Sequence, residues 1–377
     1  MNWALVGPLH PYRGGIAHYG ALLAHELARK DEVFALNFSL LYPGFLFPGR
    51  TQLDESQSAI AFPSSQRLSS IDPLSWERSA KLLAERDFDA VIFQWWHPFF
   101  GPAYGWMARR LAKLSPRTRR LFLCHNVEPH EASAVDRSLS RYGRRRAQGF
   151  LAHSQHDAAR LAEMYPASVQ RVHAHPRYSA LGESRLDRAS ARAQCGLSSD
   201  ERALLFFGLV REYKGLDLAL EALAKLDMRY RLHVVGEFYE KRTRYDALIA
   251  RLGLQERVNI VDRYVPNEEV PAWFAAADLV VLPYRDATQS GIVEIAHGAG
   301  RASLVTDVGG LSAQVQDGRT GLVVKPDDAA AIAEAVERYF DGNLEALMQK
   351  AIMEEAGSKS WAGLATTLRE LAAEINS

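Results

Sequence analysis

The stretch from Leu282 to Gly310 constrains the fold of this chain more than any other. It starts at the end of the apolar run AAADLVVLPY, crosses a polar turn-rich segment and continues with helical spacing. It then ends in the apolar run SLVTDV before two glycines. Strand, loop, helix and strand in this order are typical of a βαβ unit in a parallel sheet. Because ligands bind at the carboxyl ends of such strands, the polar loop predicts a binding site.

The start of the predicted helix in this stretch suits an anionic group. Ser290, Gly291 and Ile292 would offer free backbone amides at the positive end of the helix dipole, which favours a phosphate. Glu294, one turn further on, is placed to accept hydrogen bonds from ribose hydroxyls. A plain structural loop with a capping serine is the alternative, and the stretch alone leaves both open.

The same alternation of strands and helices runs through both halves of the chain. At 377 residues, the length suggests two domains of roughly 100–200 residues each. The segment 175–192 is polar, charged and aperiodic, which indicates an inter-domain connection. We therefore expect domains over 1–180 and 181–358, and an amphipathic terminal helix within 359–377.

Three features of the first half point to one edge of its predicted sheet. The strand Asn2 to Val6 leads into Gly14-Gly15, and glycines there let a ligand approach the backbone closely. The aromatic cluster WWHPFFG, residues 95–101, follows another buried strand. His125 follows a third, just before Asn126 and Glu128-Pro129-His130-Glu131, and is a titratable side chain suited to chemistry. A ligand-free glycine turn and a structural histidine are the alternatives.

Charge and aromatic residues leave the role of the first half open. The formal net charge of the chain is zero, so composition does not point to nucleic acid. Residues 1–175 carry 21 Lys and Arg against 15 Asp and Glu, which fits either ordinary scatter or an anionic acceptor or membrane surface. The loop with Tyr42, Phe45 and Phe47 would either bind an apolar acceptor or membrane, or belong to the core. Likewise, the arginines of the predicted helix 133–147 would form a solvated face or meet anionic lipid heads.

The cysteines and apolar runs suggest a compartment. Two distant cysteines, Cys124 and Cys195, form no disulfide framework and fit a reducing environment. The N-terminus does not resemble a signal peptide, and no apolar run reaches about 18 residues. We expect a cytoplasmic protein that is at most peripheral to a membrane.

Several well-known site patterns are missing from the sequence. There is no G-x-x-x-x-G-K-[ST] and no G-x-S-x-G. Cys124 and His125 would point to opposite faces of their strand, so they would not form a nucleophile–base pair. The histidines lack metal-ligand spacing, and we expect no metal site.

A series of motifs in the second half resembles a known family. In order they are GLVREYKGLDLALEAL, VVGE, YVPNEEVPAWFAAADLVVLPYRDATQSGIVE, TDVGGL and DGRTGLVV. Their order and spacing are similar to those of the retaining glycosyltransferases of family 4, also called group 1 glycosyltransferases. The resemblance covers the second half closely. It covers the first half loosely, through P-x-x-GG and the strand that ends at His125.

The resemblance implies the GT-B fold: two Rossmann-like, doubly wound α/β domains that face a cleft. The C-terminal helix would cross back onto the N-terminal domain. The C-terminal domain would hold a nucleotide-diphosphate sugar, and the N-terminal domain a glycan or lipid-linked acceptor. The implied reaction is metal-independent sugar transfer with retention at the anomeric carbon, with no cofactor besides the donor substrate.

The resemblance also implies roles for individual residues. Lys214 matches the lysine that neutralises the donor diphosphate, and Arg211 would assist it, because the family often has arginine where this chain has Leu209. A cation there would stabilise the charge that grows on the leaving group. His125 matches the cleft histidine that contacts the transferred sugar. The remaining donor-binding candidates are Gly14, Gly15, Gly208, Gly236, Glu237, Tyr264, Ser290, Gly291 and Ile292.

The chain departs from the family in its acidic pair. Seven residues separate Asp286 from Glu294, as in the family's pair of glutamates, so Asp286 would contact the sugar and Glu294 the ribose. Counted back from Gly300, however, the second glutamate would fall at Ile295.

We expect a sugar transferase of a glycolipid or polysaccharide pathway. A nucleotide-sugar epimerase or a sucrose- or trehalose-type synthase is a second hypothesis. The altered register of the acidic pair suggests a third, a non-catalytic donor-binding protein.

Overall fold

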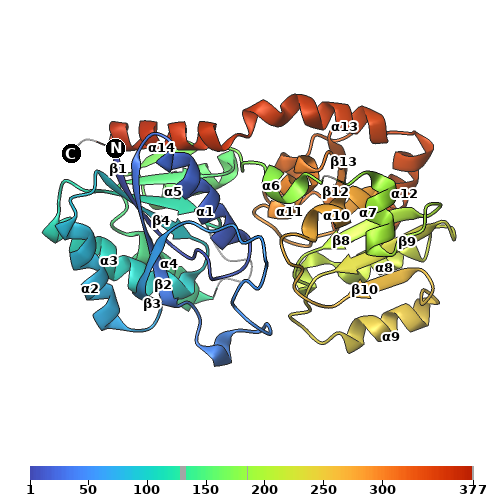
Figure 1. The fold of residues 1–377 in the computed structure, drawn as a ribbon, viewed down its shortest axis with the longest axis horizontal. Helices are drawn as coiled ribbons and strands as arrows, with labels where there is room; N and C mark the ends of the chain where they lie inside the picture. The colour runs from blue at the N-terminus through green and yellow to red at the C-terminus, as the bar shows by residue number, and fades with distance from the viewer. Residues whose placement is uncertain (128–132, 185, 376–377) are drawn as a thin grey trace.

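The computed structural model describes residues 1–127, 133–184 and 186–375. Over these residues the strands form two wholly parallel sheets, one in each lobe (Figure 1). The first has the order β3-β2-β1-β4-β5-β6-β7 and the second β10-β9-β8-β11-β12-β13. Both are doubly wound, and the strand order reverses beside β1 and β8. The structure thus has the predicted two Rossmann-like domains.

The first lobe is built on strands that are buried on both faces. Trp3 and Leu5 of β1 pack toward α1, while Ala4 and Val6 pack toward the opposite layer of helices. This double burial explains the near-continuous apolar runs of its central strands. The strands are β1 (Asn2–Val6), β2 (Glu32–Leu40), β3 (Ser64–Ser69), β4 (Ala90–Trp95), β5 (Arg119–Cys124), β6 (Gly149–Ala152) and β7 (Val169–Val172). The helices are α1 (Gly15–Ala28), η1 (Gly44–Leu46), α2 (Pro73–Glu85), η2 (Pro98–Phe100), α3 (Gly101–Leu114), α4 (Ala134–Arg144) and α5 (Gln155–Met164).

The second lobe repeats the design with shorter strands. These are β8 (Arg202–Phe207), β9 (Tyr230–Val235), β10 (Val258–Val261), β11 (Leu279–Leu282), β12 (Ser303–Thr306) and β13 (Gly321–Val324). Its helices are α6 (Ser179–Gly182), α7 (Arg188–Cys195), η3 (Glu212–Lys214), α8 (Leu216–Leu223), α9 (Thr243–Leu252), α10 (Val270–Ala276), α11 (Gly291–Gly298), η4 (Ser312–Gln314), α12 (Ala329–Asp341), α13 (Glu345–Glu354) and η5 (Glu355–Ser358).

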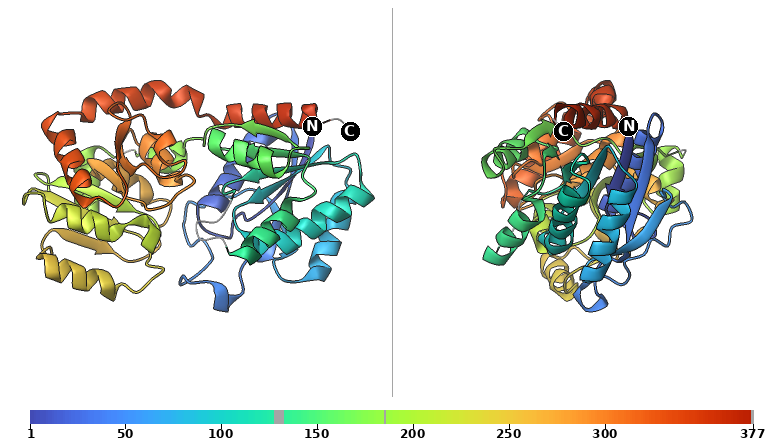
Figure 2. Two further views of the ribbon diagram at one scale, coloured as in Figure 1. Left: turned by 180° about the vertical axis from the view of Figure 1, so that it is seen from behind. Right: turned by 90° about the vertical axis from the view of Figure 1, so that its left-hand side faces the viewer.

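The terminal helix α14 (Trp361–Glu374) crosses back to the first lobe, as predicted. It lies along α1 on one side of the first sheet, and the end of α14 comes near the N-terminus there (Figures 1 and 2). Leu364, Leu368 and Leu371 are fully buried in this packing. The first lobe therefore takes part of its core from the far end of the chain.

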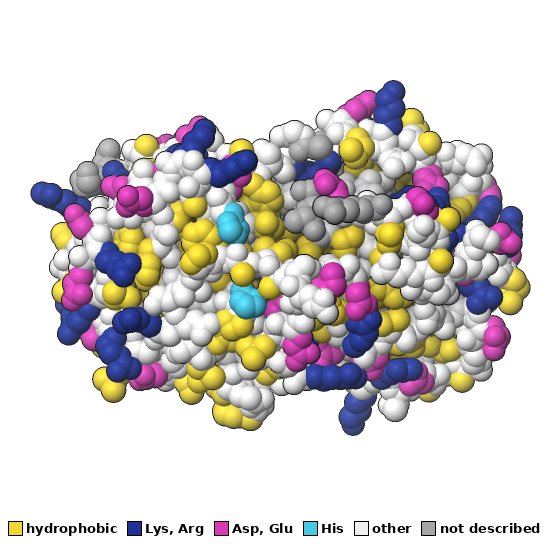
Figure 3. Space-filling view, in the orientation of Figure 1, with side chains coloured by type: hydrophobic (Ala, Val, Ile, Leu, Met, Phe, Trp, Pro, Cys, Tyr) yellow, Lys and Arg dark blue, Asp and Glu magenta, His cyan; other side chains and the backbone are white. Residues whose placement is uncertain are grey.

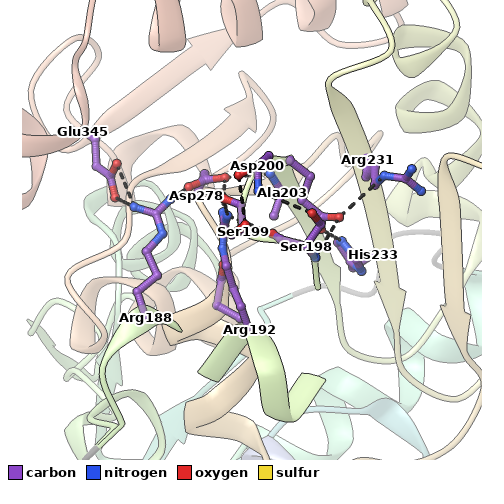
Figure 4. A network of polar contacts seen from close by, with 12 residues as sticks. Arg188, Arg192, Ser198, Ser199, Asp200, Ala203, Arg231, His233, Asp278 and Glu345 are labelled. Atoms are coloured by element: carbon purple, nitrogen blue, oxygen red, sulfur yellow. Dashed lines mark hydrogen bonds and ion pairs between the residues drawn. The ribbon is translucent and has the colours of Figure 1, made fainter. Parts of the chain in front are cut away.

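Regular structure also occurs where the sequence pattern indicated no clear element. Strands β3 and β7 are the edges of the first sheet, and their polar, half-exposed residues gave no apolar signal. Helix α6 and the first part of helix α7 lie in the segment 175–192, which was predicted to be an aperiodic connection. Arg192 of α7 donates to Asp278 at 2.8 Å, and Arg188 pairs with both Asp278 and Glu345 (Figure 4). These bonds attach α7 to the second lobe.

Candidate functional site

A cavity of about 760 Å³ lies between the carboxyl edges of the two sheets. Its first-lobe wall comes from the loops after β1, β2, β4 and β5, and its second-lobe wall from those after β8, β9, β10 and β11. The space-filling view shows hydrophobic and histidine side chains exposed near the boundary between the lobes (Figure 3). The position is the one where parallel sheets bind ligands.

Glycines open the backbone of both lobes to this cavity. Gly14 has φ 101° at the start of α1, and a Cβ atom on Gly14 or Gly15 would meet no atom within 4 Å. In the second lobe Gly236 has φ 150°, and a Cβ atom there would collide with the carbonyl of Gly208. The loops after β8 and β9 can therefore lie against each other because position 236 is glycine.

Two cations of the second lobe line the cavity. Lys214 ends the short helix η3, and Gly215 behind it has φ 67° and packs against the carbonyl of Pro283. Burial, together with the like charge of Arg211, lowers the pKa of Lys214 to about 7. The guanidinium of Arg211 lies 4.9 Å from the ring centre of Tyr239. These two predicted residues thus face the same space as Gly14 and Gly15.

The start of α11 is only partly available. Ser290, Gly291 and Ile292 line the cavity, but the amide of Ser290 donates to Gln314 Oε1 at 2.6 Å. The amide of Ile292 donates to Ser290 Oγ at 3.3 Å as a helix cap. Within the described part of the chain, the amide of Gly291 donates no such bond, and Gly291 lines the cavity.

Glu294 does not line the cavity, in contrast to the ribose contact expected for it. Its side chain is fully buried behind α11, where Oε1 accepts from Gln314 at 3.0 Å and from Lys359 at 3.3 Å. One position further along the helix, Ile295 faces the cavity instead. Because neighbouring helical residues point about 100° apart, a one-residue shift moves the acid to the other face. This agrees with the register counted back from Gly300.

Asp286 and His125 also lie off the cavity wall. Asp286 is partly buried, and its neighbours Tyr284 and Ala287 line the cavity. His125 points beneath α1, where its ring lies edge-on to Tyr19 with ring centres 4.6 Å apart, and its Nε2 lies 3.4 Å from Gln94 Oε1. Burial, with the nearby His175, lowers the pKa of His125 to about 3. The structure therefore does not bring either side chain to the lining of the cavity.

Asn126 takes the place that the sequence suggested for His125. It lines the cavity, donates to the carbonyl of Trp96 at 3.4 Å and bonds to Thr288 of the second lobe. The alternation along β5 explains the difference, because position 125 falls on the same face as Leu121 and Leu123. Cys124 is buried on the opposite face, as expected from the same alternation. Residues 128–131, which follow this strand, lie outside the described residues.

Glu237 and Tyr264 both line the cavity, together with Arg13, which sequence reasoning missed. Arg13 forms an ion pair with Glu237, and its guanidinium lies 4.5 Å from the ring centre of Tyr264. The available signal was its position directly before Gly14-Gly15 in the loop after β1. Burial raises the pKa of Tyr264 well above its usual range.

Aromatic residues form the first-lobe side of the cavity. Tyr42 stacks on Phe99, with ring centres 5.5 Å apart, and accepts a hydrogen bond from Trp96 at 3.2 Å. Phe47 also lines the cavity, whereas Phe45 of the same loop is 87% exposed. The aromatic loop is therefore divided between the cavity and the surface.

Arg144 fits neither role considered for the arginines of α4. It is fully buried, and its guanidinium lies 4.9 Å from the Trp95 ring centre and 5.6 Å from that of Tyr165.

Among the described residues, no helix is long and apolar enough to cross a membrane.

Two family models match the two lobes separately. Residues 13–177 match the model described as "Glycosyltransferase Family 4". Residues 201–341 match the model described as "Glycosyl transferases group 1". The first model spans Gly14, Gly15 and the aromatic wall, and the second spans Lys214, Glu237 and the start of α11.

Known proteins agree with these matches. A D-inositol 3-phosphate glycosyltransferase from Catenulispora acidiphila is 33% identical over 225 residues, covering 56% of this chain and 54% of that relative. The chain spans about half the length of the curated relatives it matches. A sucrose-phosphate synthase from Thermosynechococcus elongatus superposes with TM-score 0.78 at 20% identity, covering 100% and 99% of the two chains. HepE from Anabaena, in complex with UDP-glucose, superposes with TM-score 0.78 at 17% identity, covering 99% of this chain and 100% of that one. These structural likenesses concern the GT-B fold.

Proposed function

Because the chain belongs to the glycosyltransferases of family 4, we propose that it transfers a sugar from a nucleotide-diphosphate sugar to a hydroxyl group of an acceptor. The observation that carries the proposal is the cavity in which Lys214 and Arg211 face the glycine loop after β1. Cations and open amides at this edge suit a diphosphate. HepE, which has the same fold, is described as a complex with UDP-glucose.

In this proposal Lys214 and Arg211 stabilise the leaving diphosphate. Negative charge grows on the bridging oxygen as the bond to the anomeric carbon breaks, so fixed cations nearby lower the barrier. We propose that the two side chains supply this charge without a metal ion and that the anomeric configuration is retained. Gly291 and the loop at Gly14-Gly15 would offer amides to the same group.

The acceptor would bind against Tyr42, Trp96 and Phe99. An aromatic wall suits the apolar face of a sugar ring or the first part of a lipid tail. We propose a glycan or lipid-linked acceptor in a cytoplasmic reaction. Peripheral membrane contact would occur through Phe45 and Leu46, which are exposed beside the cavity. Co-sedimentation with anionic vesicles that is unchanged in Phe45→Ser would reject that contact.

The decisive test replaces Lys214 by alanine. The probe is whichever of UDP, GDP, ADP and dTDP the wild-type protein binds best. We expect Lys214→Ala to bind this nucleotide at least about tenfold more weakly than the wild type in calorimetry. Release of sugar from the matching donor should fall by about 10²–10³ in rate, as when one oxyanion partner is lost. Lys225→Ala, an exposed lysine of the same lobe, is the control. Equal affinity and rate in both variants would reject the role.

Product analysis tests the finer points. NMR of the first product reports whether the anomeric configuration is retained, and an unchanged rate with a chelator supports a metal-independent reaction. A non-catalytic donor-binding protein is the second candidate, favoured by Ile295 facing the cavity where the family has an acid. Tight donor binding with no transfer to any glycolipid or polysaccharide extract would support that candidate.

A further inference from the structure

Glu237 is the one carboxylate among the described residues that line the cavity. The other acids considered for the donor, Asp286 and Glu294, do not line it. Position 295, which faces the cavity from α11, is an isoleucine. A donor with vicinal ribose hydroxyls would therefore find a single carboxylate acceptor in the cavity, and Rossmann-like domains commonly use such an acid for ribose.

Both oxygens of Glu237 are held by the opposite lobe. Oε2 pairs with the guanidinium of Arg13, and Oε1 accepts from the backbone amide of Arg50 at 2.6 Å. Each oxygen of a carboxylate can accept two hydrogen bonds, so one position on each remains for a ligand. Two adjacent acceptor oxygens held in one orientation match the two hydroxyls of a ribose.

Arg13 is itself fixed on several sides. Its side chain is 5% exposed and lies between Tyr264 and Phe47, at 4.5 and 5.8 Å from their ring centres. It also lies 3.4 Å from the hydroxyl of Tyr239. A guanidinium held in this way has little freedom left to lose when a ligand binds.

The same edge of the cavity carries further bonds between the lobes. The segment 54–58 of the first lobe contacts the loop before α10. Asn267 donates to Ser56 Oγ at 2.9 Å and to Asp54 at 3.2 Å, and Ser58 donates to Glu268 at 3.1 Å. The bonds that hold the two lobes together therefore lie next to the Arg13–Glu237 ion pair that orients Glu237.

We propose that Arg13 and Glu237 form a clasp between the lobes, in which Glu237 binds the ribose diol of a nucleoside diphosphate and Arg13 is its positioning residue. The first lobe thereby takes part in donor recognition as well as acceptor binding. The clasp couples ribose recognition to closure of the cavity, because the arginine that orients the acid comes from the other lobe. This inference rests on the proposed function.

The test compares a ribonucleotide with its 2′,3′-dideoxy analogue by calorimetry. The probe is whichever of UDP, GDP and ADP the wild-type protein binds best. We expect the wild type to prefer the ribonucleotide by about tenfold or more, the order expected when a buried acceptor loses its partners. In Arg13→Ala the ribonucleotide should bind about tenfold more weakly and the preference should fall toward one. The control is Arg78→Ala, which changes an exposed arginine of the same lobe. This variant should keep the wild-type affinity for the ribonucleotide and the wild-type preference for it over the dideoxy analogue.

A double-mutant cycle with Glu237→Gln separates the clasp from a general structural effect. Because the two side chains act as one unit, adding Arg13→Ala to Glu237→Gln should change the ribose preference little further. If Arg13→Ala does not fold, Arg13→Lys, which keeps the charge but loses the planar fork, takes its place in the same measurements.

Three results would overturn the inference. Unchanged affinity and preference in a folded Arg13 variant would show that Arg13 does not position the acid. Tighter nucleotide binding would show that Arg13 competes with the ligand for Glu237. If the wild-type protein binds no nucleoside diphosphate, the proposed function fails first and the clasp fails with it. Retention of the affinity and the preference in Arg13→Ala, with nucleotide binding by the wild type, would overturn the clasp alone and leave the proposed function standing.

Discussion

Lys214 shows how a single side chain can be prepared for an anionic ligand. Its Nζ lies 5.4 Å from the ring centre of Tyr284, and Arg211 faces the same cavity. Burial and the like charge of Arg211 lower the pKa of Lys214 to about 7. A diphosphate brought beside it would favour the charged form again.

This shift predicts proton uptake on donor binding. At pH 8 a lysine with a pKa of about 7 is mostly neutral, so binding of UDP or another accepted nucleotide should take up close to one proton. For the same reason, affinity should fall as the pH rises above 7. Calorimetry at pH 8 in two buffers of different ionisation enthalpy measures the uptake. Lys214→Met should abolish it and Lys225→Met should not. Equal heats in both buffers for the wild type would contradict the prediction.

At the scale of elements, α7 illustrates how a polar segment becomes part of a core. Its Arg192 is buried and donates to the carbonyl of Ala276 at 3.2 Å as well as to Asp278. Asp278 also accepts from the amide of Ala203 at 2.6 Å, so a single acid connects α7, β8 and β11 (Figure 4). These contacts lie at the amino ends of the strands, on the side of the sheet away from the cavity.

Removal of Asp278 should therefore destabilise the second lobe. Asp278→Ala leaves Arg192 buried without its counter-charge, which typically costs about 3–5 kcal/mol in free energy of unfolding. Urea denaturation followed by circular dichroism measures the loss. Asp227→Ala, which removes an exposed pair with Arg229, is the matched control and should be close to the wild type. A loss no greater than that of the control would contradict the prediction.

At the scale of the whole molecule, the chain crosses between the lobes twice, and the two crossings touch. The amide of Arg177 donates to the carbonyl of Lys359 at 3.1 Å, and Trp361 Nε1 donates to the carbonyl of Arg177 at 2.9 Å. Lys359 in turn pairs with Glu294 of α11. Glu294 thus connects the helix that begins at the cavity with the junction of the lobes.

The return of α14 should make the stability of the first lobe depend on the end of the chain. Leu368 is fully buried in the cluster that contains Leu23 and Leu121, so Leu368→Ala should cost about 2–5 kcal/mol in free energy of unfolding. The matched control is Leu347→Ala on α13, where the leucine is 59% exposed and the change should stay within about 0.5 kcal/mol. Equal midpoints in urea denaturation for the two variants would contradict this dependence.

Local pattern was sufficient for much of this protein. Apolar runs separated by helical spacing predicted two doubly wound parallel sheets, because strands buried on both faces must be continuously apolar. Gly14-Gly15 before α1 marked one of the loops that line the cavity, since glycine lets a ligand approach the backbone closely. Lys214 and Arg211 came instead from the resemblance to the glycosyltransferases of family 4, through their place in the motif that follows β8.

Only the tertiary structure decided which way the polar side chains of those elements face. Glu294 and Ile295 are neighbours in the sequence, yet the helix turns the acid toward Lys359 and the isoleucine toward the cavity. Arg13 and Glu237 are 224 residues apart, and no local pattern relates them. The periodicity of a sequence shows which residues share a face of a helix or strand, but the packing of distant segments decides what each face contacts. A shift of one residue in a helix is enough to move an acid out of a site.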